Sequence, residues 1–261
     1  MKALDWVRAG WGFASRFENV KPFYLLYAAF FLVAGALAFL VLGALGSGLN
    51  ALFEGPLALE AAVKNALWLV PVALFVLLSF FVAHLWVEIA SYYRFGRVKN
   101  AFRSALSAVP GAILAILFLS LARGAIGSLD ALGGVVGTTL SLFLILAFLF
   151  VVPAYAFHRN LLKAFAQSWQ LFSGEALEVL VFAVVSWVVG AVVVVAGLIA
   201  AGLIVALSLA WPALLIVLLP LALAVFSYFL GFANAFGAGA LAAAYLTLSR
   251  RPKSFRVRRR A

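Results

Sequence analysis

The chain has 261 residues, of which 67% are apolar and only 10% are charged. A soluble domain carries about 45–50% apolar and about 25% charged residues, so these proportions exclude a single water-soluble core and indicate a membrane protein. The sequence has no cysteine, which excludes disulfides, thiolate metal sites and a cysteine nucleophile. The scarcity of cysteine and methionine is also a thermophile-like bias.

Six apolar runs follow one another along the chain. Each is long enough to cross a bilayer, whose core of about 30 Å needs about 20 residues of helix. We therefore predict an all-α membrane helical bundle, with one transmembrane domain at residues 1–249 and a basic tail at residues 250–261. The predicted spans are residues 22–45, 67–89, 105–122, 139–157, 179–205 and 223–248. The first run exceeds the about 7–15 apolar residues of a signal peptide, so we expect no cleaved leader.

Amphipathic stretches precede the first, third and fifth spans. Apolar residues recur there at helical spacing, which predicts helices that lie in the membrane interface with the apolar face towards the lipid. The three apolar stripes are Leu4, Val7, Trp11 and Ala14; Val98, Phe102, Ala105 and Val109; and Leu162, Phe165, Trp169 and Phe172. One such helix and two spans form a unit, and we predict three parallel repeats of it, at residues 1–89, 90–157 and 158–249.

The cations are distributed unequally across the predicted membrane. With six spans, 17 of the 19 Lys and Arg lie on the side of the two termini, and only Lys64 and Arg123 lie on the other side. Loops that face the cytoplasm collect Lys and Arg. We therefore predict a multi-pass protein of a prokaryotic cell membrane with both termini in the cytoplasm. The net charge of +11 is then explained by membrane topology rather than by binding to nucleic acid.

Residues 206–222 form a surplus apolar stretch between the last two spans, interrupted by Pro212 and Pro220. They either lengthen both helices or form a re-entrant or interfacial segment, which must be buried in protein or line a cavity. Comparison with the two other outer loops favours the re-entrant or interfacial interpretation. A seventh span is disfavoured because it would place the basic tail outside.

One motif runs from the end of the fourth span to the stretch before the fifth, and a second lies at the end of the last span. Their residues are Val152, Pro153, Ala164, Ser168, Trp169, Leu171 and Gly174, and then Tyr245, Arg250 and Arg251. This pattern resembles prokaryotic six-span families, namely the membrane domain associated with glycerophosphodiester phosphodiesterases and its uncharacterised relatives. Members fused to a phosphodiesterase keep catalysis in a soluble domain, which we do not expect in this chain. The resemblance thus implies a fold and no reaction.

His84 and Glu88 lie one helical turn apart on the second span and so share a face. Such a pair fits a proton relay or half of a metal site. The alternative is structural, with Glu88 paired to Arg94 or Arg97 and His84 hydrogen-bonded within the bundle. We favour the structural interpretation, because zinc usually takes a third and fourth ligand that the pair lacks. We expect no metal and no cofactor.

Asn234 is the deepest strongly polar residue of the last span. It either coordinates a substrate or ion, or makes a hydrogen bond between helices. Small residues at four-residue spacing follow it, at Ala235, Gly239 and Ala243, and permit close helix packing. We favour packing as the role of this segment.

The basic tail is predicted to contact anionic lipid headgroups, at about 1 kcal/mol per basic residue. Its cations are Arg250, Arg251, Lys253, Arg256, Arg258, Arg259 and Arg260. Nucleic acid is not expected as a partner, because Phe255 is the tail's only aromatic residue and gives no stacking platform for bases.

The sequence favours a non-enzymatic membrane protein, a scaffold or an accessory subunit, because it has no nucleophile–His–acid set and no phosphate-binding loop. Its charge-free region at residues 179–249 suits docking to another membrane protein or to a second copy. The alternative is a channel or transporter for a small or amphipathic solute. Its path would be lined by His84, Asn234 and the prolines Pro71, Pro110 and Pro153. A lipid-modifying enzyme is least supported, with His84, Glu88 and His158 as its only candidates.

Overall fold

The computed structural model describes residues 2–54, 64, 67, 69–128, 135–210 and 214–250. Regular structure in these ranges is entirely helical. The helices are α1 (Lys2–Ala14), α2 (Phe17–Glu54), α4 (Leu69–Phe95), α5 (Ala101–Leu106), α6 (Val109–Gly127), α8 (Val136–Ala147), α9 (Val151–His158), α10 (Leu161–Gly174), α11 (Ala176–Ala210) and α12 (Leu215–Ser249).

Six helical segments of the described chain are long and apolar enough to cross a membrane. They comprise α2, α4, α6, α8 with α9, α11 and α12, in the order and near the positions that the sequence predicts. The prediction of an all-α polytopic bundle with six membrane helices is therefore confirmed. The division into one domain and a tail, and the sequence repetition, stay predictions, although a short helix precedes each pair of spans in all three thirds.

The favoured interpretation of residues 206–222 was wrong. The fifth span continues to Ala210 and the sixth begins at Leu215, so the surplus residues mostly lengthen the two helices. Pro220 lies in the second turn of α12. There its missing N–H frees only one carbonyl near the helix start, so the proline costs little. Residues 211–213, with Pro212, lie outside the described ranges.

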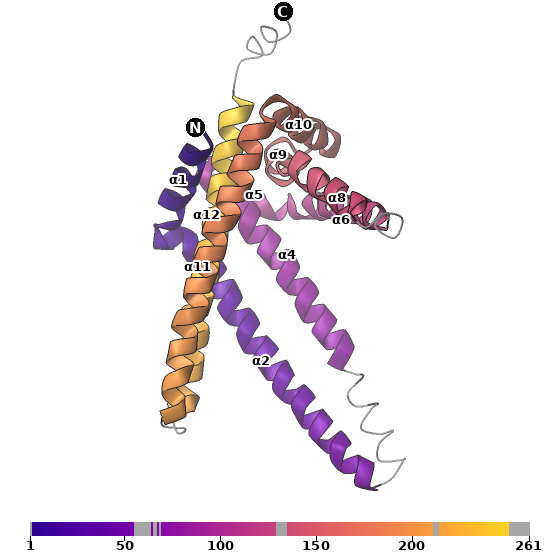
Figure 1. Cartoon of the computed structure of the whole chain (residues 1–261), viewed down its shortest axis with the longest axis vertical. Helices are drawn as coiled ribbons and strands as arrows, with labels where there is room; N and C mark the ends of the chain where they lie inside the picture. The colour runs from indigo at the N-terminus through magenta and orange to yellow at the C-terminus, as the bar shows by residue number, and fades with distance from the viewer. Residues whose placement is uncertain are drawn as a thin grey trace, which may run out of the picture.

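The three pairs of spans meet at one end of the molecule and diverge from there (Figure 1). The start of α1 and the end of α12 lie at this end, and α2 with α4 runs away from α11 with α12. We call the meeting end the hub: α1, α5, α9, α10, the first turns of α2, α6 and α11, and the last turns of α4 and α12. Most buried apolar residues belong to the hub. Away from it the spans are exposed, as in Phe39 at 77%, Leu121 at 74% and Ile216 at 83%.

The short helices α1 and α10 pack on the bundle mostly through faces other than the predicted stripes. In α1 the buried residues are Ala3, Trp6, Gly10 and Ala14, and in α10 they are Ala164, Ser168, Leu171 and Phe172. Leu4 and Trp11 are each 49% exposed and Leu162 is 83% exposed. Apart from Ala14 and Phe172, the stripes predicted for α1 and α10 thus stay largely outside the packed face, whereas Ala105 and Val109 of the second stripe are buried. The reason is that close packing of helices selects small residues, which a hydropathy pattern does not distinguish.

Contact between α1 and α12 is close enough to require glycine. A Cβ atom at Gly10 would lie 2.5 Å from the Cβ of Ala240 and 2.8 Å from the backbone oxygen of Phe236. The expected packing role of the small residues in α12 is confirmed, since Ala235, Gly239 and Ala243 are all buried. The first and last helices of the described chain are thereby joined in the hub.

Candidate functional site

A cluster of polar side chains joins three spans on the membrane side of the hub. The Nε2 atom of His84 in α4 lies 3.1 Å from Oδ1 of Asn234 in α12. The Nδ2 of Asn234 donates to the hydroxyl of Tyr27 in α2, at 2.9 Å, and to the carbonyl of Leu230, at 2.8 Å. We call Tyr27, His84 and Asn234 the polar cluster. It confirms the expectation that His84 is hydrogen-bonded within the bundle.

Aromatic rings surround the imidazole of the polar cluster. The ring centroids of Phe23, Tyr27 and Phe80 lie 5.8, 6.0 and 6.0 Å from that of His84. The Asn234 amide uses both N–H donors and one acceptor on protein groups, which leaves little capacity for a ligand. The arrangement is that of a packed interhelical joint.

Tyr27 is the member of the cluster that sequence reasoning missed. A phenol within an apolar run normally finds a hydrogen-bond partner when it is buried, so Tyr27 in the first span was a detectable signal. Which partner it takes depends on the rotation of α2 relative to α12, and the sequence alone does not fix that rotation.

Glu88 lies one turn from His84 but makes a different contact. Its carboxylate accepts a hydrogen bond from the hydroxyl of Tyr92, one turn further along α4. The expected ion pair of Glu88 with Arg94 or Arg97 was wrong. Arg94 instead donates to the carbonyl of Glu18, at 2.7 Å, and its guanidinium lies 5.9 Å from the centre of the Phe102 ring.

His158 is separated from the polar cluster by its own packing. Its ring lies edge-on to that of Tyr245, with the centroids 6.5 Å apart. The neighbouring Arg159 adopts φ 54° and places its guanidinium 5.8 Å from the centre of the Tyr93 ring. The candidates for lipid chemistry, His84, Glu88 and His158, thus have different partners and form no common site.

The helix of the fourth span is interrupted between α8 and α9, and the Ser168 side chain of α10 hydrogen-bonds to the backbone at this break. The fully buried Ser168 hydroxyl accepts from the N–H of Phe150, at 3.2 Å, and donates to the carbonyl of Ala147, at 3.0 Å. Pro153 lacks the N–H that would reach back across the break. The motif residues Pro153, Ala164 and Ser168 therefore have a structural role, because they build the joint between the fourth span and α10.

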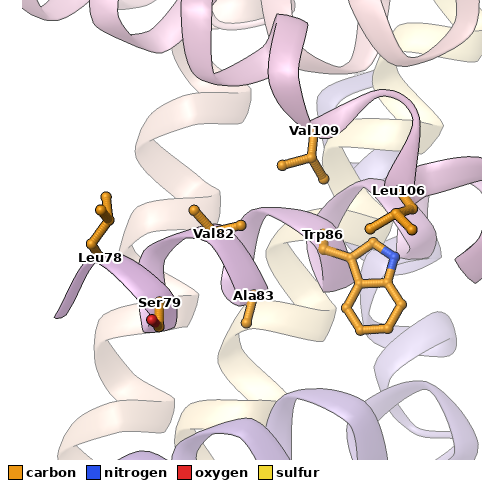
Figure 2. Close-up of a pocket in the computed structure, with 7 residues that line it drawn as sticks. All are labelled: Leu78, Ser79, Val82, Ala83, Trp86, Leu106 and Val109. Atoms are coloured by element: carbon orange, nitrogen blue, oxygen red, sulfur yellow. The ribbon is translucent and has the colours of Figure 1, made fainter. Parts of the chain in front are cut away.

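An apolar groove lies on α4 beside the turn from α5 to α6. It has a volume of about 400 Å³, and its walls include Leu78, Val82, Ala83, Trp86, Leu106 and Val109 (Figure 2). None of the polar cluster lines it. The groove is therefore a second candidate site, separate from the one that the sequence indicates.

Of the predicted headgroup contacts, only Arg250 lies within the described chain, directly after the last turn of α12. The other tail cations, from Arg251 to Arg260, lie outside it. No group of three or more His, Cys, Asp or Glu side chains that would hold a metal ion occurs among the described residues.

These features define an all-α, multi-pass integral membrane protein in which the polar cluster joins three of the membrane helices. No protein-family model matches the chain, and no curated protein or solved structure is significantly similar to it. The resemblance to the six-span membrane domain therefore stays a prediction.

Replacing Asn234 with leucine should destabilise the protein without changing its fold. The substitution removes the bonds to His84 and Tyr27. Because one interhelical bond contributes about 0.6 kcal/mol on average, we expect a loss of about 1–2 kcal/mol in unfolding free energy. Unfolding in mixed detergent micelles measures it. Ser227→Ala is the control, since Ser227 bonds only to Leu223 of its own helix, at 2.7 Å, and should stay within about 0.5 kcal/mol of wild type. Equal losses in both variants would contradict the prediction.

Proposed function

We propose that this protein is a non-enzymatic scaffold or accessory subunit of a membrane assembly. The main support is the divergence of its three pairs of spans from the hub (Figure 1). Beyond the hub, large apolar side chains such as Phe39, Leu121 and Ile216 contact nothing that covers them within the described chain. In a bilayer these faces meet lipid or the helices of other proteins.

The alternative of a channel or transporter receives less support. Its path was to be lined by His84 and Asn234, but these residues bond to each other between aromatic rings. Pro110 and Pro153 stand in the first turns of α6 and α9. A proline there sacrifices no hydrogen bond within its helix, so these two shape helix starts rather than a kinked path.

The partner proposal is tested by site-specific cross-linking, because the chain has no native cysteine. Single cysteines at the exposed Ala36 of α2 and Val195 of α11 carry a photoreactive group, and Arg8→Cys in the hub is the control. We expect protein adducts in native membranes from the two span positions and far fewer from the control. A monomer that gives only lipid adducts, and that purifies alone in mild detergent, would refute the scaffold.

We further propose that the protein lies in a prokaryotic cell membrane with both termini in the cytoplasm. The support is the distribution of Lys and Arg, together with an even number of candidate spans. A membrane-impermeant maleimide added to intact cells should label Arg123→Cys and spare Lys163→Cys, both of which are exposed positions. Lysis should make both react. Labelling of Lys163→Cys alone before lysis would reverse the orientation.

A further inference from the structure

The apolar groove on α4 is elongated along the helix. Its lining residues on α4 run from Leu78 to Trp86, about 12 Å at 1.5 Å per residue (Figure 2). Leu106 and Val109 form the opposite side. Leu78 and Leu106 are each more than half exposed, so the groove opens outwards from the span.

The end of the groove nearest the hub is held in shape by Trp86. The indole N–H donates to the carbonyl of Phe102, at 2.8 Å, and the two rings meet edge to face with centroids 5.7 Å apart. This contact joins α4 to α5. The groove wall is therefore preformed, so a ligand would lose little free energy in ordering it.

Positive charge lies directly beside this end. Arg97, Lys99 and Arg103 are all exposed in the segment that joins α4 to α6, and no acidic residue occurs between positions 89 and 129. Arg103 precedes Leu106 by three residues on α5, which places both on one face of that helix. An apolar groove within a span thus ends at a cluster of cations.

We infer that this groove binds one acyl chain of an anionic phospholipid, whose phosphate lies at Arg103. A phospholipid carries an apolar chain followed by a charged headgroup, in the same order as the apolar groove and the cations at its end. The cations favour an anionic headgroup over a zwitterionic one. The positive group of a zwitterionic headgroup would find no acidic side chain in this segment to pair with.

Native mass spectrometry after reconstitution in equimolar phosphatidylglycerol and phosphatidylcholine tests the inference. Wild-type protein should retain one phosphatidylglycerol in preference to phosphatidylcholine. Ala83→Phe fills the groove and should abolish retention, while Ala36→Phe, at an exposed alanine of α2, is the matched control and should keep it. Arg103→Gln should weaken the preference about fivefold, which corresponds to about 1 kcal/mol for one basic residue. Lys163→Gln, which removes another exposed cation of the hub, should not change the preference.

Arg103→Gln keeps the inference testable if Ala83→Phe fails to fold, because it leaves the groove walls intact. Equal retention of both lipids by wild type, or unchanged retention in Arg103→Gln, would overturn the inference. Disulfide-linked dimers of a Ser79→Cys variant in membranes would also overturn it, since a second copy would then occupy the groove.

Discussion

Gly231→Ala should be among the most destabilising single-methyl substitutions in this protein. A Cβ atom at Gly231 would lie 2.8 Å from the backbone nitrogen of Tyr24 and 3.1 Å from its Cα. Backbone atoms yield less readily than a side chain, so α2 and α12 must separate near the polar cluster. Overpacking of this kind costs about 1–3 kcal/mol, and unfolding in mixed micelles should show that loss.

Gly237→Ala supplies the control on the same helix. Nothing lies within 4 Å of a Cβ atom at Gly237. Because alanine is the better helix former by about 1 kcal/mol, this variant should be as stable as wild type or more stable. If both alanines shift stability equally, the close approach of α2 and α12 is not what Gly231 provides.

Ser168→Ala should lower the unfolding free energy by about 1–3 kcal/mol, because it leaves the buried N–H of Phe150 and the carbonyl of Ala147 without their side-chain partner. We expect the fourth span and α10 to loosen together, which hydrogen exchange of α9 and α10 would detect. The variant should be compared with Ser186→Ala, since the buried Ser186 hydroxyl has no hydrogen-bond partner within the described chain. Removing that hydroxyl should leave stability unchanged or raise it. A Ser168→Ala protein with wild-type stability would show that the joint does not depend on this hydroxyl.

The membrane helices could be predicted from the sequence because the thickness of a bilayer imposes both length and composition on them. Their helix type and number follow directly from this constraint. The extension of α11 to Ala210 was missed because an unbroken apolar run carries no signal for where a helix ends. The faces of α1 and α10 were missed because Gly10 and Ala164 contribute little hydrophobicity, although they allow the closest packing.

The candidate site was predicted only in part. His84 and Asn234 stand out as polar residues in apolar spans, but they lie 150 residues apart, and their contact depends on how α4 and α12 are rotated. The partner of Glu88 depends on which way one side chain turns, and Tyr92 competes with the arginines for it. The groove on α4 carries no sequence signal, because its walls are ordinary apolar residues of a span.

The packing of α1 also sets an order of events during synthesis. Its partners are Phe182 in α11, whose ring centroid lies 5.6 Å from that of Trp6, and Ala240 in α12. Phe182 and Ala240 are translated long after α1, and at about 5–20 residues per second they follow it by roughly 10–50 s. Until then the face of α1 that packs in the hub, with Ala3, Trp6, Gly10 and Ala14, has no partner from α11 or α12. The hub therefore closes after translation of the last span, and a chain truncated before α12 cannot complete it.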